Sequence, residues 1–169
     1  MLAEILVLGA LPLLLALAAG WDVASFTIPN FITLALMAAF AVFAITAGLS
    51  PAVIGWHVLA GFVGLFLGFT LFALGFIGGG DAKLFAAVLL WLGLKDFLPY
   101  ALLASIFGGL LTLGLMLLRQ YPLPARLSRQ DWIVKLHDAR SGVPYGVALV
   151  AGAFFLLPST EIFRLAASA

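Results

Sequence analysis

Cysteine is absent from the 169-residue sequence, and histidine is nearly so. Without cysteine there is no disulfide framework, no thiolate metal site and no cysteine nucleophile. The two histidines, His57 and His137, lie far apart and lack the paired spacing of metal ligands. We therefore expect no metal site and no cofactor in this protein.

Charge is also scarce, because charged residues make up only 9% of the sequence while hydrophobic residues make up 65%. Soluble domains carry about a quarter charged residues, and no soluble fold of this length could bury so much apolar surface. The composition therefore predicts an integral membrane protein that is surrounded by membrane lipids. The net charge of +1 gives no indication of a nucleic-acid partner.

The first 20 residues contain Glu4 but no Lys or Arg, so the basic region of a secretory signal is missing, and we expect a retained first span. Prolines, glycine clusters and charged residues divide the sequence into separate apolar runs. These runs predict an all-α bundle of about six transmembrane helices, which forms a single domain over residues 1–169. The predicted spans are about 3–20, 28–48, 52–76, 82–94, 97–118 and 143–157. In the third span, Gly61, Gly64 and Gly68 share one helical face, which predicts close packing against a neighbouring helix.

The long polar stretch, residues 119–142, contains five of the eight basic residues: Arg119, Arg126, Arg129, Lys135 and Arg140. The positive-inside rule therefore predicts that this basic loop is cytoplasmic and follows the interface, with a short amphipathic helix as one option. Six spans then place the segments around Asp22 and Asp81 on the same cytoplasmic face and both chain ends on the other side.

Two of the seven acidic residues, Asp22 and Asp81, stand next to apolar helices, whereas the other five have ordinary solvated positions. Ionisable groups at the membrane are costly and point to function. We expect both aspartates at helix starts, where free N–H groups favour a carboxylate. The glycines Gly78, Gly79 and Gly80 before Asp81 leave the backbone free to adopt conformations that are closed to other residues, and they allow a substrate backbone to come close.

Two neighbouring carboxyl groups can share one proton, because like charges a few ångströms apart cannot both ionise cheaply. The ionised group could then activate water while the neutral group donates to a peptide carbonyl, which is acid–base hydrolysis without metal or thiol. The same pair could equally form the site of a proton- or cation-coupled transporter. The residues alone leave both alternatives open.

Two motifs stand out in the sequence: Asp22 is followed by Ile28, Pro29 and Asn30, and residues 78–83 have the pattern Gly-x-Gly-Asp-x-Lys. Together these motifs resemble those of the type IV prepilin peptidase family, whose members are polytopic GxGD aspartyl proteases. The late segment Gly142–Gly146 is similar to the Pro-Tyr-Gly segment of the family. The resemblance implies that Asp22 and Asp81 are catalytic. It also implies supporting or substrate-binding roles for a second set: Pro29, Asn30, Gly78, Gly80, Lys83, Tyr145 and Gly146.

The resemblance further implies removal of a basic leader from a prepilin or pseudopilin precursor at the cytoplasmic face of the plasma membrane. Larger members carry an N-terminal region with paired cysteines that is associated with N-methylation. The present sequence resembles the short peptidases of tight-adherence (Flp) pili, so we expect no methylation, although archaeal preflagellin peptidases are also similar. Related chains often carry basic residues between the first aspartate and Ile28, whereas residues 23–27 here have none. A non-catalytic pilus assembly protein is the remaining alternative.

Overall fold

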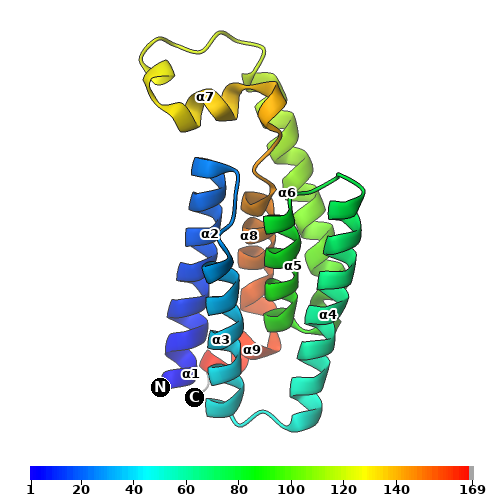
Figure 1. The fold of residues 1–169 in the computed structure, drawn as a ribbon. Helices are drawn as coiled ribbons and strands as arrows, with labels where there is room; N and C mark the ends of the chain where they lie inside the picture. Colours follow the sequence, from blue (N-terminus) through cyan, green and yellow to red (C-terminus); the bar gives the residue numbers. More distant parts are fainter. Residues whose placement is uncertain (168–169) are drawn as a thin grey trace.

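A computed structural model describes residues 1–167, which form helices joined by short connections and contain no β-strand. The all-α prediction is therefore confirmed, and residues 168–169 of the predicted domain lie outside the described residues. The α-helices are α1 (Leu2–Glu4), α2 (Leu11–Ser25), α3 (Asn30–Thr46), α4 (Pro51–Ala73), α5 (Gly79–Leu92), α6 (Phe97–Leu118), α7 (Asp131–His137), α8 (Tyr145–Leu156) and α9 (Glu161–Ala167). Most helices run along one common axis, while α7 crosses one end of the bundle and α9 lies at the other, beside the N-terminus (Figure 1).

Three helical segments are long and apolar enough to cross a membrane: Leu2–Ser25, Pro51–Ala73 and Leu94–Leu118. The first is continuous, because the π-helical stretch Ile5–Ala10 joins α1 to α2. The segments Tyr145–Ser159 and Glu161–Ala167 form a fourth candidate that is bent by 57°. These lengths confirm a membrane protein. The count of six spans stays a prediction, since α3 and α5 are shorter.

Helix α5 is the central helix of the bundle and packs against α3, α4 and α8. Nine of its 14 residues are buried. Because neighbouring helices surround α5, protein and not lipid covers most of this short apolar helix. The predicted glycine face of α4 lies against it: an added Cβ at Gly64 would be 3.1 Å from the Ala86 Cα, and one at Gly68 would be 3.0 Å from the Ala82 Cα. The close packing predicted from these glycines is therefore confirmed.

Trp91, near the end of α5, belongs to the core. Its side chain is 1% exposed, and its indole Nε1–H donates a 2.9 Å hydrogen bond to the Leu36 carbonyl oxygen of α3. The rings of Phe40 and Phe43 pack around it, with centroids 5.6 and 5.5 Å from the indole. A buried indole needs a partner for its N–H, and the α3 backbone provides one.

The basic loop, residues 119–142, contains the short helix α7, so the option of a helix in this loop is confirmed. Arg119, at the end of α6, holds the loop in place. Its Nε and Nη2 atoms donate to the Leu136 carbonyl oxygen at 3.0 and 2.8 Å, and Nη2 also donates to the Gly142 carbonyl oxygen at 2.6 Å. Because a charged donor strengthens each bond, the guanidinium ties α7 and the following turn to α6.

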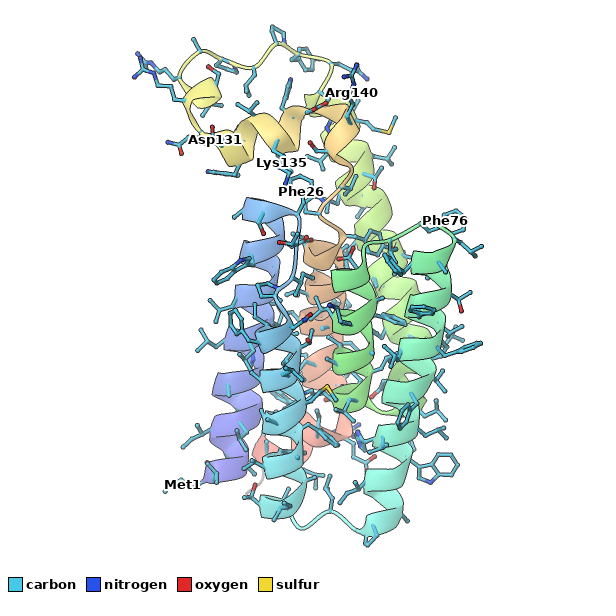
Figure 2. The ribbon with its side chains drawn as sticks, viewed as in Figure 1. Met1, Phe26, Phe76, Asp131, Lys135 and Arg140 are labelled. Atoms are coloured by element: carbon cyan, nitrogen blue, oxygen red, sulfur yellow. The ribbon has the colours of Figure 1, made fainter. Side chains whose placement is uncertain are left out.

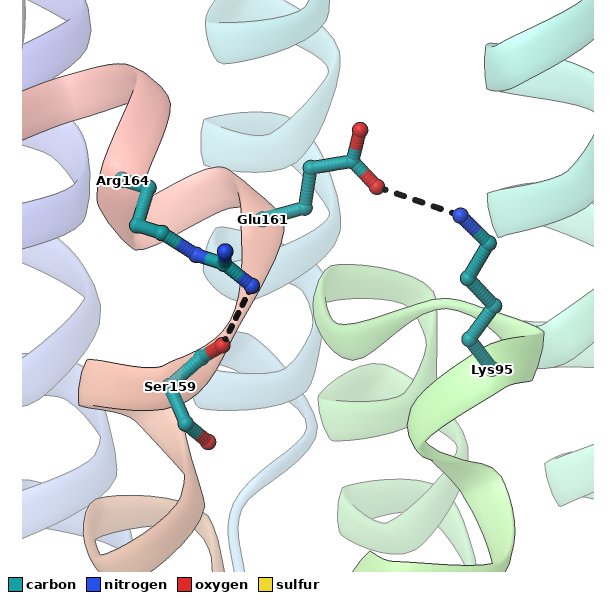
Figure 3. Close-up of polar contacts among 4 residues, drawn as sticks. All are labelled: Lys95, Ser159, Glu161 and Arg164. Atoms are coloured by element: carbon teal, nitrogen blue, oxygen red, sulfur yellow. Dashed lines mark hydrogen bonds and ion pairs between the residues drawn. The ribbon is translucent and has the colours of Figure 1, made fainter.

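The charged groups at the opposite end of the bundle form surface contacts. Lys95 and Glu161 make a 3.5 Å ion pair, and Arg164 donates to the Ser159 carbonyl oxygen at 3.0 Å (Figure 3). The side chains of Lys95 and Glu161 are 88% and 75% exposed, so water and salt screen the pair. This end therefore carries polar contacts of the kind expected at a membrane surface.

Candidate active site

Asp22 lies in the last turn of α2 and is only 4% exposed. The prediction that it opens a helix is therefore wrong: the first helix continues past residue 20 and ends at Ser25, with Phe26 as its C-cap. Phe26 has a left-handed backbone (φ 57°), and its N–H donates a 2.7 Å hydrogen bond to the Asp22 carbonyl oxygen. A left-handed residue at this position ends a helix by turning the chain away from the axis.

The carboxylate of Asp22 is stabilised by another helix. The C-terminal end of α2 presents free carbonyl oxygens, not N–H groups, so it offers a carboxylate no donor. The backbone N–H of Gly146, in the first turn of α8, donates a 2.7 Å hydrogen bond to Asp22 Oδ2. The positive end of the α8 dipole therefore faces this buried carboxylate.

Asp81 lies in the first turn of α5, as predicted, and is 8% exposed. Its Oδ2 accepts a 3.0 Å hydrogen bond from the Gly78 N–H, which closes the start of the helix. The conformational freedom that the three glycines allow is not used for a left-handed backbone, because Gly78, Gly79 and Gly80 are not among the positive-φ residues of the described chain. Close approach explains these glycines better, since a Cβ at Gly78 would lie 3.0 Å from Asp81 Oδ2.

Asp22 and Asp81 come together at the start of α8. The two carboxyl groups interact electrostatically, and the Gly146 backbone interacts with both of them. Two buried carboxyl groups that interact are costly to ionise together, which favours sharing of one proton between such groups. The structure thus brings together two carboxyl groups from α2 and α5 beside the start of α8, with Gly146 as the donor to Asp22 and Gly78 as the donor to Asp81.

Ile28 is the packing contact that joins the three motifs. An added Cβ at Gly80 would lie 3.0 Å from the Ile28 backbone N, and one at Gly146 would lie 2.8 Å from the Ile28 Cδ1. Such distances leave no room for a side chain at either glycine. Gly80 and Gly146 therefore let the starts of α5 and α8 approach the segment between α2 and α3.

Asn30 and Lys83 form a second link between the first two motifs, because Lys83 Nζ donates to Asn30 Oδ1. Asn30 does not cap α3, since Pro29 is the N-cap of this helix and no side-chain cap bond forms there. Both side chains are exposed. The pair ties the start of α3 to the first turn of α5.

Tyr145 packs mainly against α6, although it lies within electrostatic range of Asp81. Its ring covers Gly108, where a Cβ would overlap the ring atoms. Its hydroxyl donates a 3.4 Å hydrogen bond to the Ala104 carbonyl oxygen. These contacts give Tyr145 a role in packing α8 against α6. A substrate-binding role for Tyr145 stays a prediction.

Lys135 of α7 reaches the end of α2 (Figure 2). Its Nζ donates a 2.9 Å hydrogen bond to the Ser25 carbonyl oxygen and lies 5.0 Å from the centroid of the Phe26 ring. The segment 23–27 lacks basic residues of its own, and Lys135 supplies a positive charge there. Sequence reasoning missed this contact, because the partners are 110 positions apart and no local pattern connects them.

The ends of α2, α5 and α8 that hold the carboxyl groups lie at the end of the bundle crossed by α7 (Figure 1). Both aspartates and the basic loop therefore lie at one end of the bundle, and the cytoplasmic orientation of this end stays a prediction. The described residues contain no group of three or more His, Cys, Asp or Glu side chains that could hold a metal ion.

Comparison with protein families decides the class of this protein. The model of the type IV leader peptidase family matches residues 9–113. The chain belongs to the type IV leader peptidase family. The matched part of this leader peptidase contains both aspartates, Asn30 and Lys83, whereas α7 and Gly146 lie beyond it. No curated protein and no solved structure matches the chain.

Proposed function

We propose that this protein is a membrane aspartyl endopeptidase in which Asp22 and Asp81 catalyse cleavage of the leader from type IV prepilin-like precursors. The observation that carries the proposal is that two buried carboxyl groups from different helices interact beside the start of α8, where the Gly146 N–H donates to Asp22. Membership of the leader peptidase family indicates the class of reaction, which is peptide-bond hydrolysis. The position of Asp22 and Asp81 supports these two residues as the catalytic groups.

The proposed reaction needs only the two carboxyl groups and water. The ionised carboxylate takes a proton from water while the water oxygen bonds to the scissile carbonyl carbon, and the protonated carboxyl group donates to the carbonyl oxygen. The C–N bond then breaks as the amine nitrogen takes a proton from one carboxyl group, while a hydroxyl group of the tetrahedral intermediate returns its proton to the other. The products are an amine and a carboxylic acid, and the pair again holds one proton. Hydrogen bonds from Gly146 and Gly78 hold Oδ2 of Asp22 and Oδ2 of Asp81, so both groups keep their positions through this cycle.

We infer that the carboxyl groups face the cytoplasm across the inner membrane. Five of the eight basic residues lie in the loop that crosses this end of the bundle, and positive residues remain on the cytoplasmic side. A precursor that enters from the cytoplasm would bring the junction between its polar leader and its apolar helix to Asp22 and Asp81. The resemblance to the tight-adherence enzymes favours an Flp-type precursor.

We expect the new N-terminus to stay unmethylated. The sequence contains no cysteine, whereas the methylating members of the family carry paired cysteines. The two motifs present in this chain belong to the peptidase reaction alone. The mass of the mature N-terminus measures cleavage and methylation together.

The test is co-expression with an Flp-type pilin precursor, followed by mass determination of the pilin. Asp22→Asn and Asp81→Asn keep the shape of each side chain but remove the ionisable carboxyl group. Both variants should insert into the membrane and leave the leader uncut. Asp96→Asn and Asp131→Asn change aspartates outside the pair, and they should cleave like the unmodified enzyme.

Normal cleavage by either Asp22→Asn or Asp81→Asn would contradict the proposal. Ion flux in liposomes that needs both aspartates, without cleavage of any precursor, would favour the transporter alternative. Normal piliation by the double variant, in cells that need the protein, would favour a non-catalytic assembly role.

A further inference from the structure

The side chain of Tyr100, in the first turn of α6, is fully buried, with a relative exposure of 0%. Within residues 1–167, no group forms a hydrogen bond with its hydroxyl oxygen. Burial of a hydroxyl group without a partner costs free energy, so such groups are rare in folded proteins. A phenylalanine would fill the same space without this cost. The hydroxyl group of Tyr100 therefore needs an explanation other than packing.

The ring of Tyr100 lies against α5, close to the turn that carries Asp81. It stacks on the ring of Phe85, with centroids 5.4 Å apart and an interplanar angle of 18°. Phe85 follows Asp81 by four residues, so the two side chains share one face of α5. The buried tyrosine thus packs beside the helix turn that follows the proposed catalytic aspartate.

Tyr145 connects Tyr100 with Asp81. Its hydroxyl group reaches α6 at Ala104, which follows Tyr100 by four residues and therefore lies on the same helical face. The two phenol groups interact electrostatically, and Tyr145 interacts in the same way with Asp81. Tyr100, Tyr145 and Asp81 therefore form a series of polar groups that runs from α6 through α8 to α5.

The Tyr145 hydroxyl group is loosely held in this series. Its bond to the Ala104 carbonyl oxygen is 3.4 Å long, whereas a hydroxyl donor usually lies about 2.7 Å from its acceptor. A carboxylate is a better acceptor, because a hydrogen bond to a charged group is stronger. Oδ2 of Asp81 accepts from the Gly78 N–H, and an ionised carboxyl group has lone pairs for further donors. The Tyr145 O–H could therefore exchange its weak bond for a stronger one to Asp81.

We propose that Tyr100 is a positioning residue of the peptidase reaction, whose hydroxyl donates to the Tyr145 hydroxyl and thereby directs the Tyr145 O–H to the Asp81 carboxylate. The inference rests on the proposed function and deepens it, because it adds a support for Asp81 that neither motif contains. No proton is transferred along the series. The two phenol groups hold the carboxylate in one orientation while water attacks, and each hydrogen bond of such a chain strengthens the next.

The test measures kcat and KM for a synthetic Flp-type precursor with the full-length enzyme in lipid vesicles. Tyr100→Phe removes only the hydroxyl group. It should lower kcat about fivefold, which is the effect of one lost hydrogen bond, and change KM by less than about twofold. Tyr145→Phe should lower kcat at least as much. In the Tyr145→Phe background, Tyr100→Phe should have no further effect, because Tyr100 acts through Tyr145.

The midpoint of thermal unfolding in one fixed detergent separates positioning from packing. Because the buried hydroxyl group lacks a partner among the described residues, Tyr100→Phe should keep or raise the midpoint while it lowers kcat. Tyr121→Phe is the matched control, since it removes the hydroxyl group of an exposed tyrosine in the basic loop and should change neither quantity. A lower midpoint together with a lower kcat in Tyr100→Phe would make Tyr100 a packing residue and overturn the inference.

An unchanged kcat in Tyr100→Phe would also overturn the inference, as would an equal loss with and without the Tyr145 hydroxyl group. Failure of the unmodified enzyme to cleave the precursor, or normal cleavage by Asp81→Asn, would overturn the peptidase function and the positioning role with it. Cleavage that depends on Asp81 but not on the Tyr100 hydroxyl group would overturn the positioning role alone. The two failures are therefore distinguishable in one set of measurements.

Discussion

The backbone N–H of Gly146 donates a 2.7 Å hydrogen bond to Asp22 Oδ2, although the two residues are 124 positions apart. The contact joins the first turn of α8 to the last turn of α2. It gives a buried carboxylate a donor that its own helix end cannot provide. The last large helix of the bundle is thus part of the site that the two sequence motifs only begin to define.

Gly146→Ala should lower the rate of precursor cleavage about 100-fold while the protein still inserts. The new Cβ would lie 2.8 Å from both Asp22 Oδ2 and Ile28 Cδ1, so the carboxylate must move. A shift of about 1 Å in a reacting group is enough for a loss of this size. The measurement is the initial rate of leader removal in detergent or vesicles.

Gly109→Ala is the control for Gly146→Ala, because a Cβ at Gly109 meets nothing within 4 Å. It should leave the rate unchanged. Equal rates for Gly146→Ala and the unmodified enzyme would show that the close packing at Asp22 does not matter for cleavage.

The link between Lys83 and Asn30 predicts energetic coupling of the two motifs. Lys83→Met and Asn30→Ala should each lower the cleavage rate, and the double variant should be no worse than the single ones. The hydrogen bond predicts a coupling of about 1 kcal/mol, which is about fivefold in rate. A double-mutant cycle on kcat/KM measures it.

The exposed pair Lys95 and Glu161 provides the comparison cycle. Lys95→Met and Glu161→Gln should show coupling near zero, since water screens this pair. Additive effects of Lys83→Met and Asn30→Ala would mean that their contact does not position the site.

Much of the fold follows from the sequence, because hydrophobic runs and glycine spacing are local patterns. The span 97–118 coincides with α6, and the glycine face of α4 lies against α5 as predicted. The extent of the first helix could not be predicted. Apolar content declines after residue 20, yet α2 continues to Ser25, since α8 supplies the donor that makes a carboxylate tolerable there.

The site was predictable to the extent that its residues stand in short motifs. Asp22 and Asp81 were identified from their surroundings, and the structure brings them together. The tether from Lys135 and the acceptor role of Asn30 were missed, because each depends on contacts between elements far apart in the sequence. Such contacts depend on how the helices pack together, and short sequence patterns do not predict them.

Gly68→Ala should destabilise the protein by about 1–3 kcal/mol, which is the usual cost of overpacking a filled contact. A Cβ at Gly68 would lie 3.0 Å from both the Ala82 Cα and the Ala82 carbonyl oxygen, and the helix backbone cannot easily give way. The midpoint of thermal unfolding in one fixed detergent measures the effect. Gly55→Ala, on the same helix but with nothing within 4 Å of its Cβ, should not lower the midpoint. Equal midpoints for both variants would contradict the packing argument.

The orientation of the site predicts where a protease can reach the basic loop. Arg126 and Arg129 are exposed, so trypsin added to inverted inner-membrane vesicles should cut after them, while trypsin added outside right-side-out vesicles should not.

Lys135→Met removes the bond to the Ser25 carbonyl oxygen and the contact with Phe26, so α7 should detach more often. Loss of about 1 kcal/mol of contact predicts roughly fivefold faster cutting at the two arginines.

Lys95→Met is the control for Lys135→Met, because it removes a lysine from the opposite end of the bundle and should leave the cutting rate unchanged. Gel analysis of the fragments that end at Arg126 and Arg129 separates these cuts from the trypsin site that Lys135→Met itself removes. Cutting from the outside alone would place the loop, and with it Asp22 and Asp81, on the outer face of the membrane. A precursor presented from the cytoplasm could not then reach the carboxyl groups, so this result would contradict the proposed route of the substrate even if the peptidase reaction were retained.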